Sequence, residues 1–535
     1  MRRRGAVRDP LVVASLPMVV VVAALLGAAP ALAGFFRVRA QPVMQASVKD
    51  AEAGLGNAGF SGVGGGEARR LPAPTSVRVT NVRLGAAAAG IRRVSFDVAW
   101  DESWRGPQRP AWVEAADNWD AAWVFVKYRV DGGAWEHATL AAGGHSVPRG
   151  AAIGVPGDRI GAFLHRSSSG YGPFAADGLG LAWDVGADRV PTGVSVEVQP
   201  FAIEMVYVPQ GPFALGSGGS GGGEFRAGGT VNAPFVVSGP GSIALGDGSG
   251  ELTWTAGGGG AARGDTGSPS GSTGASFPTG FGAYYVMKHE VTQGEYVNFL
   301  NTLTQAQAEA RTHAEEQHRY AITGRSVGSY ATSLPFVAMN FISWADGAAF
   351  ADWAGLRPMT ELEYEKAARG PSAPMPDAYA WGSTSIAQAT GLSNEGAVSE
   401  TPTPANANAA FGSASGVQGP VRVGSFASPG RSRWEVGAGY YGATELSGNV
   451  WEHVVTVGYA EGRAFTGAHG DGALGAGGDA DVPSWPDATA VGAGFRGGAW
   501  NSDDGQLRVA DRTHAANPNA RRGNRHGWRG ARSAP

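Results

Sequence analysis

The chain has 535 residues, no cysteine and a formal net charge of −4 at neutral pH. The small net charge gives no overall attraction for nucleic acid or an acidic membrane surface. The lack of cysteine excludes disulfides, thiolate nucleophiles, zinc–thiolate sites and iron–sulfur clusters. Hydrophobic residues make up 43% of the chain and charged residues only 16%, a mix typical of globular rather than disordered proteins.

The first 33 residues predict a cleavable secretory signal. Four arginines lie within the first eight residues, an apolar run begins at Leu11, and the small-x-small sequence ALA at 31–33 is typical of a signal-peptidase site. A retained membrane anchor is the alternative, but the apolar run is short for a span and ends at the cutting site. We therefore expect cleavage after Ala33 and a secreted, periplasmic or cell-surface protein without a stable membrane span.

Residues 34–73 are rich in alanine and glycine, lack periodicity and are expected to form a flexible lead-in. Apolar and polar side chains then alternate in runs such as 76–84, 94–100 and 123–130, with the period of half-buried strands. Asp131-Gly132 separates two such runs, and glycine allows the positive φ that a tight hairpin requires. These features predict an antiparallel β-sandwich domain over residues 74–203.

Tryptophan is frequent in this region. Stacking of carbohydrate on exposed rings is one interpretation, and packing inside and between the sheets is the other. We favour packing for the set as a whole: Trp100, Trp104, Trp112, Trp119, Trp123, Trp135 and Trp183.

The remaining part, residues 204–535, mixes strands, short helices and long loops. A Gly/Ser-rich insertion occupies about 214–278. A capping box that starts at Thr292, a cap at Ser343 and a second capping box that starts at Thr360 predict three short helices. Gly355 and Gly370 are expected to end the second and third of these helices. The pattern predicts an α+β domain.

Seven segments of this part, in order, resemble the motifs of the sulfatase-modifying-factor family, which includes the formylglycine-generating enzymes. They are EMVYVPQGPF (204–213), HEVTQGEY (289–296), LRPMTELEYEKAARG (356–370), YAWG (379–382), LSGNVWEH (446–453), FRGGAWN (495–501) and GWR (527–529). The resemblance covers about 60% of the chain and implies a variant of the C-type-lectin-like fold for residues 204–535.

The chain lacks the cysteines on which the enzymes of this family depend. In those enzymes two cysteines after the GGS turn bind copper and activate oxygen; the first matches Ser502, and the second falls near 504–507. A serine hydroxyl is a poor ligand for the soft Cu(I) ion. We therefore expect neither copper nor formylglycine generation by this route.

The resemblance also implies a structural calcium site at the GNVWE segment. Its ligands would be the side chains of Glu445 and Glu452 and the backbone carbonyls of Gly448 and Val450. Hard oxygen ligands suit calcium, and two neighbouring carboxylates repel each other unless a cation lies between them. The alternative is that Glu452 forms an ion pair with an arginine.

The substrate groove of the relatives corresponds to residues 496–532, which contain eight arginines and three aspartates. By motif alignment, the candidate ligand-binding residues are Trp451, Asn501, Ser502, Asp503 and Arg512. Arginines and an aromatic wall suit a peptide, a glycan or a small molecule, while the interspersed acids disfavour nucleic acid. Arginines that tie loops to carboxylates are the structural alternative for this region.

We therefore expect an exported, non-catalytic binding protein that recognises a ligand or a partner protein. The alternative is a metal-dependent oxidoreductase of the same superfamily that uses cysteine-free chemistry.

Overall fold

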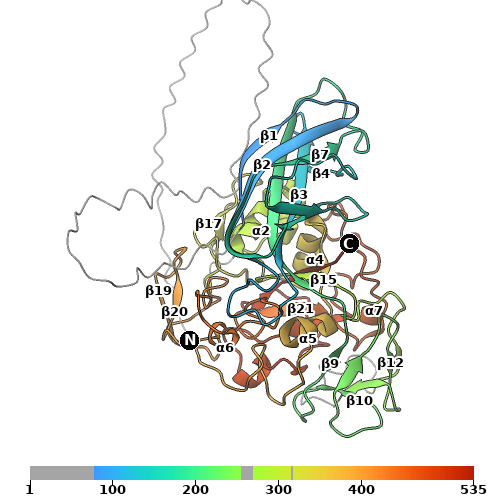
Figure 1. Cartoon of the computed structure of the whole chain (residues 1–535), viewed down its shortest axis with the longest axis vertical. Coiled ribbons are helices and arrows are strands. Elements are labelled where there is room, and N and C mark those ends of the chain that lie inside the picture. Colours follow the sequence, from blue (N-terminus) through green and yellow to red (C-terminus); the bar gives the residue numbers. More distant parts are fainter. Residues whose placement is uncertain (1–76, 255–268, 315–316) are drawn as a thin grey trace, which may run out of the picture. The chain divides into compact units, whose positions relative to one another are not determined.

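The computed structural model describes residues 77–254, 269–314 and 317–535. The expected signal segment, the lead-in at 34–73 and the middle of the glycine-rich insertion lie outside the described residues. The regular structure is mostly β, with antiparallel sheets in the N-terminal part and a few short helices (Figure 1). None of the described helices is both long enough and apolar enough to cross a bilayer.

The largest sheet has eight strands, all paired in antiparallel fashion. It combines strands from both ends of the described chain. In spatial order they are β18 (Arg357–Pro358), β24 (Gly530–Ser533), β15 (Tyr284–Met287), β8 (Val196–Val208), β3 (Asp120–Val130), β6 (Ala162–Arg166) and β5 (Ala151–Gly154), with β4 (Glu136–His137) beside β3.

Strand β8 lies at the centre of this sheet and crosses the domain border expected at 203/204. Its Ile203 pairs with Trp123 of β3, while its Met205 pairs with both Ala121 of β3 and Met287 of β15. The expected border therefore lies inside one continuous strand. The contacts do not separate residues 77–203 from the rest of the described chain.

A second sheet of three antiparallel strands packs on the N-terminal part of the large sheet. It consists of β1 (Arg78–Leu84), β2 (Ile91–Arg105) and β7 (Gly170–Asp184), which lie side by side in Figure 1. Alternate side chains such as Phe96 and Val98 of β2 share one buried cluster with Val124 and Val126 of β3. The apolar residues of the alternation predicted at 94–100 therefore form the inward face of β2.

Most of the tryptophans in this region are core residues, as the packing interpretation predicts. Trp100, Trp104, Trp112, Trp123 and Trp183 are each at most 1% exposed. The predicted Asp131-Gly132 hairpin is also present: Gly132 has φ +73°, and β4 pairs with the end of β3.

The three predicted helices are confirmed with their caps. They are α2 (Gln293–Leu300), α4 (Trp344–Trp353) and α5 (Glu361–Arg369), each with a complete capping box. Helix α3 (Gln305–Arg311) has a capping box as well, and two single-turn helices, α6 (Arg433–Val436) and α7 (Ala460–Arg463), follow.

The Gly/Ser-rich insertion forms small sheets rather than one long loop. Strands β9 (Phe213–Leu215) and β11 (Phe235–Val237) pair with each other. A second small sheet contains β10 (Phe225–Ala227), β13 (Leu252–Trp254), β12 (Ala244–Leu245) and β14 (Gly271–Ser272). Two further hairpins join β16 (Ile322–Thr323) to β17 (Ala331–Thr332) and β19 (Gly391–Ser393) to β20 (Thr401–Thr403).

Candidate functional site

Three of the sequence motifs meet in one small sheet. Strand β21 (Trp451–Val455) pairs in antiparallel fashion with β22 (Ala493–Arg496) and in parallel fashion with β23 (His526–Gly527). The motifs at 446–453, 495–501 and 527–529 are therefore neighbours in space, and the candidate ligand-binding residues lie around this sheet.

The chain makes a tight turn directly after β22. The Ser502 amide donates to the Ala499 carbonyl at 2.9 Å, and the Ala499 amide donates to Oγ of Ser502 at 3.0 Å. Ser502 is thereby 2% exposed, whereas Asp503 is exposed and Asn501 is half-buried. Oδ1 of Asn501 has no hydrogen-bond partner in the described part of the chain.

Two other candidate ligand-binding residues are buried. Trp451 is 3% exposed and packs edge-on against His514, with ring centroids 5.1 Å apart. Arg512 is fully buried: its Nε and Nη2 donate to Glu361 at 2.6 and 3.0 Å, and its guanidinium lies 3.9 Å from the ring centre of Phe225. For Arg512 the structure favours the structural alternative, since it ties the glycine-rich insertion to α5.

The region of the second family cysteine is a short 3₁₀ turn, Asp504–Leu507. Leu507 is fully buried and packs with Leu446 and Val454 in a hydrophobic cluster. No side chain of this turn is a thiol.

The expected calcium ligands lie close to a buried group of charges. Oε1 of Glu452 accepts from Arg529 Nε at 2.8 Å and lies 2.7 Å from Arg529 Nη2, so the ion-pair alternative holds for that oxygen. Glu445 has φ +56°; one of its oxygens accepts from the Gly424 amide at 2.9 Å and the other from the Thr444 hydroxyl. Gly448 has φ +102°, a value that favours glycine.

This group also contains carboxylate oxygens that accept no hydrogen bond from a described residue, although Oε2 of Glu290 lies 4.0 Å from Nη2 of Arg529. Oε2 of Glu452 and both oxygens of Glu290 make no hydrogen bond to any described residue, and Glu290 is fully buried. Burial raises the pKa of Glu290 well above its usual value, with Arg529 opposing and Glu445 and Glu452 adding to the rise. Burial likewise raises the pKa of Glu452. The orphaned oxygens fit a cation, because a cation, a proton or a hydrogen-bond donor would relieve them.

A second carboxylate group was not predicted from the sequence. One oxygen each of Asp352, Asp471 and Asp481 lies within 4.8 Å of the others, and this group could hold an ion such as Ca²⁺. Asp352 is buried at the end of α4, and its oxygens accept from the amides of Asp471 and Asp481 at 3.0 Å each. Helical periodicity could place Asp352, but no local pattern links it to a loop more than 100 residues away.

A buried lysine accompanies this group. Lys127 is 1% exposed, and its Nζ donates to the Gly472 carbonyl at 2.5 Å. Burial lowers the pKa of Lys127 to about 7, although Asp352 and Asp471 favour its charged form. Burial raises the pKa of Asp352 to about 7. An ion at the three aspartates would therefore compete with the charged form of Lys127.

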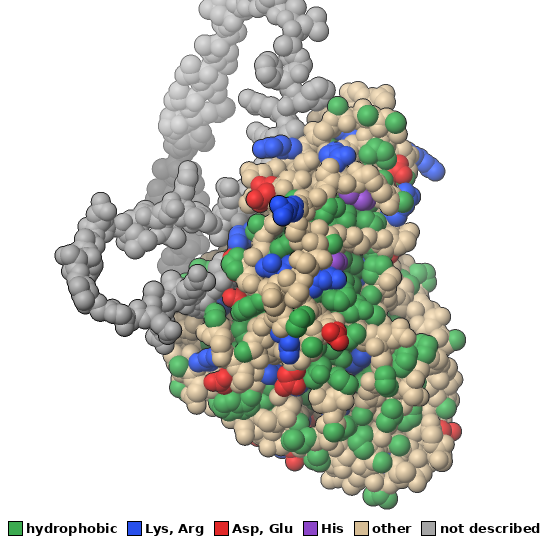
Figure 2. All heavy atoms as spheres, in the orientation of Figure 1, with side chains coloured by type: hydrophobic (Ala, Val, Ile, Leu, Met, Phe, Trp, Pro, Cys, Tyr) green, Lys and Arg blue, Asp and Glu red, His purple; other side chains and the backbone are tan. Residues whose placement is uncertain are grey.

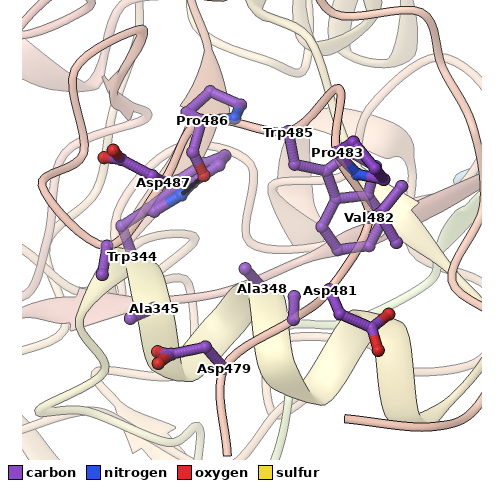
Figure 3. Close-up of a pocket in the computed structure, with 12 residues that line it drawn as sticks. Trp344, Ala345, Ala348, Asp479, Asp481, Val482, Pro483, Trp485, Pro486 and Asp487 are labelled. Carbon is purple, nitrogen blue, oxygen red and sulfur yellow. Dashed lines mark hydrogen bonds between the residues drawn. The ribbon is translucent and has the colours of Figure 1, made fainter. Parts of the chain in front are cut away.

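A surface hollow of about 240 Å³ lies next to this group, over one side of α4 (Figure 3). Its walls combine apolar residues, with Ala345 and Ala348 of α4 below and Val482, Pro483 and Trp485 opposite, with three aspartates (Figure 3). On the face shown in Figure 2, acidic and basic side chains are interspersed rather than gathered by sign.

Comparison with known proteins finds similarity over the larger part of the chain. A family model described as "Sulfatase-modifying factor enzyme 1-like domain" matches residues 194–534. Among solved structures, variable protein 1 of Treponema denticola is similar at 16% sequence identity and a TM-score of 0.31, over 62% of this chain and 96% of that chain. No curated protein matches. The family match includes β21, β22, β23 and the turn that carries Asn501.

Proposed function

Because this chain belongs to the sulfatase-modifying factor enzyme 1-like family, we propose that it is an exported, non-catalytic member that binds a ligand or a partner protein. The observation that carries the proposal is the complete lack of cysteine. The catalytic cysteines of formylglycine generation are absent, and Ser502 and Leu507 offer no soft ligand for copper. The predicted signal at 1–33 supports export, and the C-type-lectin-like variant that the resemblance implies would suit binding.

The reachable part of the proposed binding surface is the turn at 501–503. Asp503 offers an exposed carboxylate, and half-buried Asn501 beside it has an unpaired but buried Oδ1 that a ligand could reach only after a small local movement. The chain at 524–525 runs beside it, because the carbonyls of Asn524 and Arg525 accept from Trp500 Nε1 at 3.2 Å and from the Trp451 amide at 2.7 Å. Short polar groups on a rigid sheet suit recognition of a peptide or glycan by hydrogen bonds.

We further propose one structural Ca²⁺ at Glu445, Gly448, Val450 and Glu452. Its support is the resemblance together with the orphaned oxygens of Glu452 and Glu290. Calcium prefers such oxygen ligands, and would offset the excess of buried carboxylates. The three aspartates around Asp352 are the competing position for an ion.

The binding proposal is tested by selecting ligands with the wild-type protein and comparing how well the double variant Asn501→Ala/Asp503→Ala retains them. Immobilised glycans and a displayed peptide library would be presented to the purified wild-type protein. Ligands of the proposed surface are retained by the wild type and by Asp177→Ala, an exposed residue of β7, but are lost in the double variant. Ligands retained equally by all three proteins would contradict a binding role for this turn.

Metal and oxygen measurements separate the proposal from its alternative. The binding protein should contain calcium and consume no oxygen. Stoichiometric iron or copper together with oxygen consumption would instead favour the cysteine-free oxidoreductase.

A further inference from the structure

A small cavity lies where the end of β2 meets the chain after β15, outside the groove region. It has a volume of about 20 Å³, which is room for one water-sized group or a metal ion. Glu204 of β8 and His289 line it and are only 8% and 6% exposed. Nε2 of His289 has no hydrogen-bond partner among the residues that the structure describes.

The hydrogen bonds of Thr444 determine the tautomer of His289. The Thr444 hydroxyl donates its single proton to the Glu445 carboxylate. Its oxygen, 2.7 Å from Nδ1 of His289, can then only accept from that nitrogen. Neutral His289 therefore carries its proton on Nδ1. Nε2 is left with a free lone pair.

This lone pair faces a carboxylate oxygen. Nε2 of His289 and Oε2 of Glu204 are 3.9 Å apart. Both atoms are electron-rich, so their approach in a buried site is unfavourable unless a cation or a hydrogen-bond donor lies between them. Two metal–ligand bonds of about 2.0–2.2 Å each can span this separation.

The charges around the cavity are compatible with a cation. Glu102 and Asp101 also line it, against one ammonium group, that of Lys288, which lies 2.6 Å from Oε1 of Glu204. Asp101 is shared with Arg78 at the surface. Trp112 lines the cavity with a buried Nε1–H that lacks a partner within the described chain, and this donor could hold a metal-bound water or hydroxide.

We propose that this cavity binds one divalent transition-metal ion, with Nε2 of His289 and Oε2 of Glu204 as its protein ligands. Imidazole with carboxylate suits zinc and its neighbours in the first row rather than calcium. The Glu445–Thr444–His289 chain of hydrogen bonds would orient the ring, as outer-shell partners of metal-binding histidines commonly do. The inference does not depend on the binding function proposed for the 501–503 turn.

Cobalt(II) provides a direct probe. The full chain would be stripped with a chelator and kept in excess Ca²⁺, so that oxygen sites for hard cations are filled. Co²⁺ would then be titrated and followed by its visible absorption and by calorimetry. We expect one equivalent to bind, and His289→Gln and Glu204→Gln each to weaken binding by about 100-fold or more, beyond the usual loss for an outer-shell partner.

The control is His145→Gln, because His145 lies in the N-terminal part and does not line the cavity; its cobalt affinity should equal that of the wild type. Circular dichroism melts without cobalt would show that each variant folds. If a variant does not fold, the anomalous signal of cobalt in crystals of the wild-type protein locates the ion directly. Absence of saturable binding, unchanged affinity in His289→Gln, or cobalt bound elsewhere would overturn the proposal.

Discussion

Several arginines in this molecule are buried and bound to glutamates. Arg496, Arg512 and Arg529 are each fully buried, and each donates to one or two carboxylates. Removing one partner from such a pair leaves an uncompensated buried charge, which costs far more than the loss of a surface ion pair. These arginines are therefore structural connections between distant segments.

Replacing Arg512 by Ala should lower the free energy of unfolding by about 3–5 kcal/mol. Among the described residues, the change leaves Glu361 with only Arg496 as a charged partner, and it removes the cation that packs on Phe225 and Trp254. Denaturant unfolding followed by circular dichroism measures the effect.

The matched control is Arg521→Ala. Arg521 is exposed, and a surface replacement should change stability by no more than about 0.5 kcal/mol. If both variants were equally stable, Arg512 would not have the structural role assigned to it.

His453 should make stability depend on pH. Burial lowers its pKa from 6.5 to about 3, and His526 adds to the fall. Below pH 6.5 the unfolded chain binds a proton that folded His453 does not, so this contribution is complete above pH 6.5 and is lost as the pH falls toward 3. The His453→Gln variant lacks this proton linkage. For each pH unit below 6.5, the unfolding free energy of the wild type should therefore fall by about 1.4 kcal/mol relative to that of the variant. A difference that stays constant between pH 7 and 5 would contradict this assignment.

The residue types of the candidate site could be predicted from the sequence, but their exposure could not. Motif alignment located Trp451, Ser502 and Arg512, yet all three are buried, because the covering segments come from elsewhere in the chain. The insertion contributes Phe225, whose ring lies against Arg512. The sequence contains no local signal for such coverage.

Among the secondary-structure elements, the helices and their first residues are the most readily predicted. The capping boxes at Thr292 and Thr360 and the cap at Ser343 rely on contacts three residues apart, so a single sequence contains the whole signal. The capping box from Thr304 to Gln307 carries the same signal and begins a further helix, α3, beyond the three predicted. Strand β8 was harder, because its antiparallel partners are distant in sequence and nothing local shows that it continues across residue 203.

Helix α4 allows the cost of tight packing to be compared with the gain in helix propensity from replacing glycine by alanine. Gly347 lies on this helix, where Ala would normally be more favourable by about 1 kcal/mol. A Cβ at this position, however, would lie 1.9 Å from the Trp528 ring, and overpacking of a core costs about 1–3 kcal/mol. Gly347→Ala should therefore lower the melting temperature.

Gly143→Ala is the control for this packing test, since a Cβ added there would meet no heavy atom of the described residues within 4 Å. Its melting temperature should stay close to that of the wild type. If Gly347→Ala melted at or above the temperature of the wild type, α4 and Trp528 would not pack as closely as described.

At the scale of the whole molecule, the buried carboxylates predict that stability depends on a bound cation. A chelator should lower the melting temperature, because an ion that binds only the folded state stabilises it, by about 2.7 kcal/mol at 100 times its Kd. Added Ca²⁺ should restore the original value. Differential scanning calorimetry measures both steps.

Two outcomes would contradict the calcium site at Glu445 and Glu452. One is a melting temperature that a strong chelator leaves unchanged. The other is a chelator effect that disappears in Asp481→Asn, because the ion would then belong to the aspartates around Asp352.

This chain belongs to the family but lacks the catalytic cysteines of its formylglycine-generating enzymes. The most direct test incubates the purified protein with copper, oxygen and a cysteine-containing sulfatase-motif peptide, and then measures the peptide by mass spectrometry. The peptide mass should remain unchanged. The mass loss that accompanies conversion of the thiol to an aldehyde would contradict the central claim.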